Sequence, residues 1–173
     1  TKNKTTLLIM AAGMGSRFGS LKQLALLGPH KKTLLHYSIY DAVHAGFDKI
    51  VFIIRRSFEN EFKEAVGKYA ESLVETVYCF QEMDQLPGNL PPIQREKPWG
   101  TAHAIWAAKD HIHEPFIAIN ADDFYGRDAF VKMHDFVASN SDERCFSLAG
   151  YRLAATLSEN GTVSLSLIHI SEP

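Results

Sequence analysis

A short run of consecutive apolar residues constrains the fold of this chain most. Residues 49–55 read KIVFIIR, with an apolar side chain at every position from Ile50 to Ile54. A strand that is apolar on consecutive positions is buried on both faces, which is typical of parallel sheets. The run therefore predicts a buried strand inside a parallel sheet.

The rest of the chain alternates between strand-like and helix-like segments. We expect strands over residues 7–10, 49–55, 74–80, 116–121 and 145–153, and helices over 33–45, 57–72, 101–112 and 127–138. Apolar residues recur at helical spacing in the helical segments, and Gly46 is placed to end the first of them. This rhythm predicts an α/β protein with a layered, mostly parallel, twisted sheet and helices on both faces.

The first predicted strand opens into a glycine-rich loop, AAGMGSRFGSLKQL, over residues 11–24. Gly13 and Gly15 lack a Cβ, so backbone N–H groups can approach an anion closely. Arg17 offers a planar fork for phosphate oxygens, and Lys22 offers a compact charge. The spacing fits neither the G-x-G-x-x-G of dinucleotide-binding proteins nor the G-K-[ST] of P-loops. We interpret the loop as a polyphosphate site of another kind.

Three chemically interesting places follow the carboxyl ends of predicted strands, where ligands collect in open α/β sheets. The glycine loop leaves the first strand, Gln81 follows the third, and Asp122 and Asp123 follow the fourth. Mg²⁺ takes carboxylate and phosphate oxygens as ligands. Successive side chains of an extended segment point to opposite faces, so at most one of the two aspartates faces a bound nucleotide. For Asp123 we favour a turn residue that bonds its own backbone.

A second motif, KPWGTAHA, covers residues 97–104. Gly100 permits close backbone approach, and Thr101 is placed to cap the following helix, whose N-terminus favours negative groups. We interpret His103 as structural rather than as a general base, because phosphoryl chemistry at such a site needs none. Trp99 either stacks on a base or closes the loop.

These motifs, in this order, resemble the nucleotide-sugar pyrophosphorylases, a family of sugar-phosphate nucleotidyltransferases, over roughly residues 5–163. The resemblance implies a Rossmann-like fold and transfer of a nucleotidyl group from an NTP to a sugar 1-phosphate or a similar phosphorylated acceptor. Pyrophosphate is released, and Mg²⁺ is the cofactor. By the same resemblance, Arg17 and Lys22 are the catalytic cations and Asp122 is the metal ligand. The implied nucleotide-binding residues are Ala12, Gly13, Gly15, Ser16, Gln81, Gly100 and Thr101.

Gln81 corresponds to a base-reading amide in many members of that family. Here residues 84–98 separate it from Gly100 by a longer interval than in the compact members, which leaves its role open. Two other functions also stay open. One is a catalytically silent nucleotide-binding domain, and the other is a glycosyltransferase that uses a nucleotide-sugar.

Composition argues against several classes of partner. The 173 residues carry 18 Lys and Arg against 20 Asp and Glu, a net charge of −2 without a long basic block, so we expect no nucleic-acid partner. No apolar stretch reaches about 18 residues and the polar start is not a signal peptide, so we expect a cytoplasmic protein without a membrane partner. Cys79 and Cys145 lie within apolar runs, which predicts two buried, reduced thiols rather than a disulfide.

Residues 1–163 are expected to form the nucleotide-binding part of a nucleotidyltransferase domain that lacks the usual C-terminal portion. Asn160-Gly161 predicts a hairpin turn. Residues 164–173 do not resemble the family, and we interpret them as a foreign tail; the alternative is a short homologue that ends on an apolar strand. An unpaired strand over 165–170 predicts self-association, hence a homo-oligomer.

Overall fold

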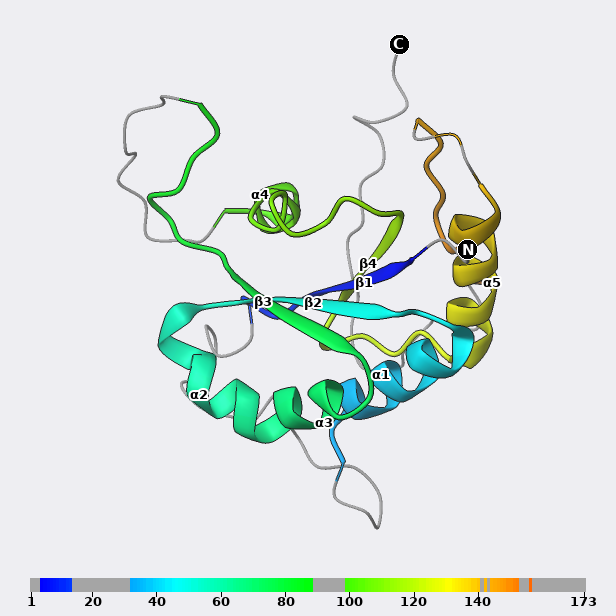
Figure 1. Cartoon of the computed structure of the whole chain (residues 1–173), viewed down its shortest axis with the longest axis horizontal. Helices are drawn as coiled ribbons and strands as arrows, with labels where there is room; N and C mark the ends of the chain where they lie inside the picture. Colours follow the sequence, from blue (N-terminus) through cyan, green and yellow to red (C-terminus); the bar gives the residue numbers. More distant parts are fainter. Residues whose placement is uncertain are drawn as a thin grey trace.

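The computed structural model describes residues 4–13, 32–88, 99–140, 142, 144–152 and 156. These residues form one parallel sheet with helices on both faces (Figure 1). The sheet has the order β3-β2-β1-β4, and each pair of neighbouring strands is parallel. The predicted fold class is confirmed. The strands are β1 (Thr6–Met10), β2 (Lys49–Ile54), β3 (Glu75–Phe80) and β4 (Phe116–Asn120).

Helices connect the strands, as parallel pairing requires. The first, α1, ends at Gly46, whose φ of 115° is the left-handed conformation that glycine adopts most easily. The helix predicted over 101–112 is regular only over its first six residues and continues as turns to residue 111. The helices are α1 (Leu34–Ala45), α2 (Glu59–Phe62), α3 (Lys68–Glu71), α4 (Thr101–Trp106) and α5 (Arg127–Ser139).

The core lies on both sides of the sheet. The larger cluster, between the sheet and helices α1, α2, α3 and α5, includes Ile9 and Phe52. The smaller cluster lies under α4 and includes Leu8, Val51 and Ala108. Every residue of β2 is buried, as its apolar sequence predicts, whereas the outer strands β3 and β4 are partly exposed.

The helical segment between β2 and β3 contains a wide turn at Lys63–Gly67, where the sequence predicts a regular helix over 57–72. Gly67 allows the backbone to lie against Tyr78 of β3: a Cβ at residue 67 would lie 2.2 Å from the Tyr78 hydroxyl oxygen. That hydroxyl donates a hydrogen bond of 2.7 Å to Glu71. This close contact between residues eleven positions apart therefore requires glycine at position 67.

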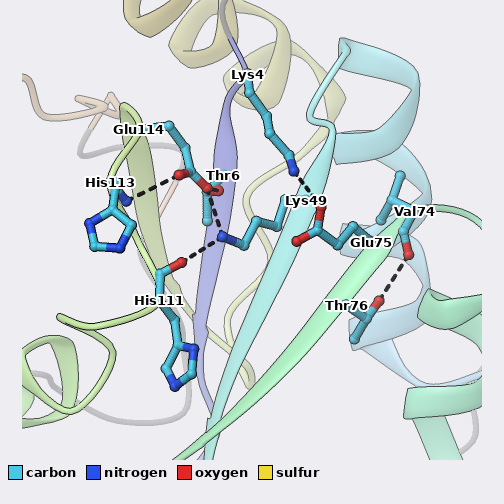
Figure 2. A network of polar contacts seen from close by, with 9 residues as sticks. All are labelled: Lys4, Thr6, Lys49, Val74, Glu75, Thr76, His111, His113 and Glu114. Carbon is cyan, nitrogen blue, oxygen red and sulfur yellow. Dashed lines mark hydrogen bonds and ion pairs between the residues drawn. The ribbon is translucent and has the colours of Figure 1, made fainter.

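A polar network occupies the amino edge of the sheet (Figure 2). The Lys49 ammonium lies 2.9 Å from Glu114 Oε1 and 2.5 Å from the carbonyl oxygen of His111, and the Lys49 side chain is only 9% exposed. The Thr6 hydroxyl and the His113 amide also donate to the Glu114 carboxylate. Burial raises the pKa of Glu114, but the hydrogen bonds from Thr6, Lys49 and His113 outweigh it and lower the pKa to about 2. Glu114 is therefore ionised at neutral pH.

The prediction of a strand over residues 145–153 is wrong. Residues 145–152 pair with no strand among the described residues, and Phe146 is 92% exposed. Because this segment lies outside the sheet, Cys145 is exposed, contrary to our prediction, whereas Cys79 of β3 is buried as expected; both cysteines are free. None of the helices within the described residues has the length and apolar character needed to cross a membrane.

Candidate nucleotide-binding site

The carboxyl ends of the strands bring three sequence-predicted places to one edge of the sheet. Backbone hydrogen bonds continue the ladder just beyond each strand. Ala11 N–H donates to Ile53 O (2.8 Å), Gln81 N–H to Ile54 O (3.0 Å), and Ala121 N–H to Met10 O (3.1 Å). The start of the glycine loop, Gln81 and the aspartate pair therefore follow strands that are aligned at this edge.

The described part of the glycine loop ends at Gly13. Ala12 is buried against the core under α4, whereas Gly13 is exposed. Among the described residues, no atom other than those of its chain neighbours would lie within 4 Å of a Cβ at Gly13. Gly15, Ser16, Arg17 and Lys22 lie outside the described residues, and their roles stay predictions.

Asp122 and Asp123 differ in their surroundings. Asn120 Nδ2 donates to Asp123 Oδ2 (2.8 Å), and the Tyr125 hydroxyl lies 3.3 Å from the same oxygen. Asp123 therefore has a structural role in the turn after β4, as we expected. Its carboxylate bonds neighbouring side chains, however, and not its own backbone. Asp122 is exposed, and no described residue donates a hydrogen bond to its carboxylate. Of the two, Asp122 has the carboxylate that is open to a ligand.

Tyr125 completes the turn after β4. Its hydroxyl accepts a hydrogen bond of 2.9 Å from the Asn120 amide, and its carbonyl accepts one of the same length from the Tyr151 hydroxyl. Burial raises the pKa of Tyr125 to about 12, with the Asp123 carboxylate adding to the effect. Tyr125 stays neutral and holds the backbone that carries Asp122.

Gln81 lies between the end of β3 and the start of α4. Its amide nitrogen is 3.0 Å from the carbonyl oxygen of Trp99, 3.4 Å from that of Gly100 and 3.2 Å from His103 Nδ1. Despite the long interval in sequence, the base-reading candidate and the Gly100–Thr101 candidate are therefore side by side.

The start of α4 differs from our prediction in one respect. Gly100, not Thr101, is the residue that precedes the helix, and Thr101 is its first residue and is exposed. Gly100 has a φ of −72°, and no atom of the described part of the chain, its neighbours in sequence apart, would lie within 4 Å of a Cβ there. Trp99 donates from Nε1 to the Met83 carbonyl oxygen at 3.0 Å, which favours the loop-closing interpretation of this residue.

A cavity that we did not predict from the sequence lies at the ends of β2 and β3. It measures about 470 Å³, and Gln81 is part of its wall. The Arg56 guanidinium stacks over the Phe80 ring at 4.0 Å and lies 3.7 Å from Glu82. The sequence signal for this cavity is the pair of arginines, Arg55 and Arg56, that directly follows the central strand β2. The lining residues are Arg55, Arg56, Ser57, Gln81, Glu82, Met83 and Asp84.

The donor set at this edge suits a hard cation bound together with phosphates. No group of three His, Cys, Asp or Glu side chains that could hold a metal ion occurs among the described residues. Mg²⁺ commonly takes only one or two protein carboxylates, with waters and substrate phosphates as its other ligands. The open carboxylate of Asp122 fits that mode of binding, and Asp123, already bonded to Asn120, does not add a second free carboxylate.

Comparison with known proteins defines the class. The family model for nucleotidyl transferases matches residues 6–165, a span that contains all four strands and every site residue discussed above. The chain belongs to the nucleotidyl transferase family. The match agrees with the resemblance that the sequence motifs show. The parent family is a family of enzymes.

Individual relatives are sugar-phosphate nucleotidyltransferases. The chain is 28% identical over 130 residues to UTP–glucose-1-phosphate uridylyltransferase of Bacillus subtilis (strain 168), covering 67% of this chain and 43% of that one. Its fold is similar to that of a UDP-glucose pyrophosphorylase solved with UDP-glucose (TM-score 0.51, 22% identity, 77% of this chain and 53% of that one).

A protein assigned as a glucose-1-phosphate thymidylyltransferase of Bacillus anthracis, solved with sucrose, also shares the fold. The TM-score is 0.56 at 18% identity, over 76% of this chain and 50% of that one. The chain thus spans about half the length of these relatives.

Proposed function

We propose that this chain is the nucleotide-binding part of an enzyme that transfers a nucleotidyl group from an NTP to a sugar 1-phosphate. The observation that carries the proposal is the juxtaposition at the carboxyl edge. There the start of the glycine loop, the Gln81 amide and the open Asp122 carboxylate follow three strands of one parallel sheet, β1, β3 and β4, in a chain that matches the nucleotidyl transferase family. The relatives named above add the acceptor class, a sugar 1-phosphate.

The chemistry asks the protein mainly to position two polyanions. A phosphate oxygen of the acceptor attacks the α-phosphorus of the NTP, a new P–O bond forms, and the bond to the β-phosphate oxygen breaks, so that pyrophosphate leaves with the electron pair. The acceptor is already an anion, and no general base is required. Arg17 and Lys22 would hold the triphosphate and offset its charge, together with backbone N–H groups of the glycine loop.

Asp122 is the residue that would hold Mg²⁺ against the phosphates, and the ion would supply charge neutralisation there. Gln81 and Gly100 would contact the base. We further propose that the enzyme works in the cytoplasm, where its phosphorylated substrates are found. Self-association through residues 165–170 also stays a proposal, because these residues lie outside the described part of the chain.

Two matched variants test the metal assignment. Asp122→Asn removes the open carboxylate, whereas Asp123→Asn keeps an oxygen that can accept from Asn120. Calorimetric titration of NTP with and without Mg²⁺ should show that Asp122→Asn loses the Mg²⁺-dependent gain in affinity and that Asp123→Asn keeps most of it. The reverse pattern would place the metal on Asp123 and contradict the assignment.

Turnover tests the reaction itself. Release of pyrophosphate should be measured with UTP, dTTP, CTP, GTP and ATP, each with glucose 1-phosphate and other sugar phosphates. UTP with glucose 1-phosphate is the first pair to test, because it is the pair named for the Bacillus subtilis relative. NTP binding without pyrophosphate release from any pair would favour the catalytically silent domain instead.

A further inference from the structure

The Gln81 amide is held in one orientation by acceptors on one side. Three acceptors surround its nitrogen: the carbonyl oxygens of Trp99 and Gly100, and His103 Nδ1. An amide NH₂ group donates two hydrogen bonds, and its oxygen donates none. If the amide turned over, its oxygen would face three acceptors. The nitrogen therefore faces α4, and Oε1, on the other side of Cδ in the same plane, points away from these acceptors.

His103 can accept from Gln81 only in one protonation state. Its Nε2 lies 2.5 Å from the carbonyl oxygen of Gln85, which can only accept, so Nε2 carries the proton. In the neutral ring Nδ1 then has a free lone pair, and it lies 3.2 Å from the Gln81 nitrogen. The Gln85 carbonyl thus selects the tautomer that keeps the Gln81 amide in place.

We propose that His103 is a positioning residue that fixes the Gln81 amide so that Oε1 is presented as a hydrogen-bond acceptor to the base of the nucleotide. The proposal rests on the proposed function, since it assumes that a nucleotide binds at this edge. Its new content is the polarity of the contact: the site offers a fixed acceptor, not an amide that can turn to suit either polarity.

The surroundings of Oε1 agree with this role. None of the described residues donates a hydrogen bond to it, and Gln81 is part of the wall of the 470 Å³ cavity at the ends of β2 and β3. Uracil and cytosine have opposite donors and acceptors at ring position 3 and at the exocyclic group on position 4. A fixed acceptor must therefore distinguish UTP from CTP, which an amide free to rotate would do poorly.

A purely structural role for His103 makes a different prediction. In that case the effect of a substitution would come from the hydrogen bond to Gln85, which links the loop after β3 to α4. A second hydrogen bond also holds this loop, because Trp99 Nε1 donates to the Met83 carbonyl oxygen at 3.0 Å. Loss of the Gln85 bond alone should therefore leave the loop in place.

Two isosteric variants separate these roles. The amide of Asn reaches as far as Nδ1 of histidine, so His103→Asn keeps an acceptor for Gln81 and loses the donor to Gln85. The amide of Gln reaches as far as Nε2, so His103→Gln keeps the donor and loses the acceptor. Dissociation constants for UTP and CTP should be measured by calorimetry in the presence of Mg²⁺. We expect His103→Asn to retain the wild-type ratio of the two constants, and His103→Gln to bring it roughly threefold to tenfold closer to one.

Further measurements keep the inference falsifiable. Gln81→Leu should reduce the ratio at least as much as His103→Gln does. Long-range ¹H–¹⁵N correlation spectra of the wild-type protein should show His103 protonated at Nε2 and unprotonated at Nδ1; the opposite tautomer would overturn the inference. So would a ratio that is unchanged in His103→Gln and lost in His103→Asn. Wild-type protein that binds no NTP would instead refute the proposed function.

Discussion

Removing one partner of the Lys49–Glu114 pair should destabilise this protein strongly. The two side chains are 9% and 16% exposed, and Nζ lies 2.9 Å from Oε1. Glu114→Gln removes the negative charge and leaves the Lys49 ammonium with neutral acceptors, the carbonyl oxygen of His111 and the amide oxygen of the new side chain. A buried ammonium without a counter-charge is the costly state, because the desolvation of the charge is no longer compensated.

The size of the effect can be bounded from the contacts. Breaking a buried ion pair typically costs about 3–5 kcal/mol. We expect Glu114→Gln to cost about 3 kcal/mol, at the low end, because the His111 carbonyl still accepts from Nζ at 2.5 Å. Lys49→Met should cost less, about 2 kcal/mol, because the Thr6 hydroxyl and the His113 amide still donate to Glu114.

A double-mutant cycle tests this reasoning. Urea unfolding should be followed by tryptophan fluorescence and far-UV circular dichroism for the wild type, both single variants and Lys49→Met/Glu114→Gln. We expect the double variant to lose at least about 1 kcal/mol less than the sum of the single losses, with unchanged m-values. Additive losses would show that the two charges do not stabilise one another, and the interpretation of the network would be refuted.

Three further predictions concern stability and reactivity. The pKa of Glu114 is lowered to about 2, so the ionised carboxylate adds up to about 3 kcal/mol to the free energy of unfolding. This stabilisation is complete above pH 4.5 and is lost as the pH falls toward 2. The urea midpoint, measured as a function of pH, should show this loss in the wild type and not in Glu114→Gln. Gly67→Ala should destabilise by about 1–3 kcal/mol, because the new methyl group meets the Tyr78 hydroxyl, and by less in a Tyr78→Phe background; an equal loss in both backgrounds would contradict the contact. Iodoacetamide should label Cys145 quickly in the native protein and Cys79 only in urea, because Cys79 is buried and burial raises its pKa to about 11; mass spectrometry of the labelled peptides would detect any native labelling of Cys79.

Strands and helix ends could be predicted because their signals are local. The apolar run from Ile50 to Ile54 is long enough to specify a strand that is buried on both faces, and Gly46 ends α1 as its position indicates. The segment from residue 145 also contains several apolar residues and is not a strand, because a strand needs a neighbour with which to pair. The sequence of the segment itself does not show whether such a neighbouring strand exists.

The site could be predicted only in outline. Parallel topology places Gln81 and Asp122 at one edge, and the sequence was sufficient for that inference. The partners of Gln81 at α4 and the bonds of Asp123 to Asn120 and Tyr125 depend on the positions of the side chains in the folded protein. The spacing of residues in the sequence does not predict such contacts.

The strand order has a consequence for synthesis of the protein on the ribosome. β1 is made first and pairs with β2 on one side, but its other side pairs with β4, which begins about 60 residues after β2 ends. At roughly 5–20 residues per second, that edge of β1 waits roughly 3–12 s for its partner. Throughout this time a strand of buried apolar residues has unpaired backbone groups, which other chains can bind. The nascent chain is therefore most exposed to aggregation before residues 116–120 emerge, and this is the interval in which a chaperone would be of most use.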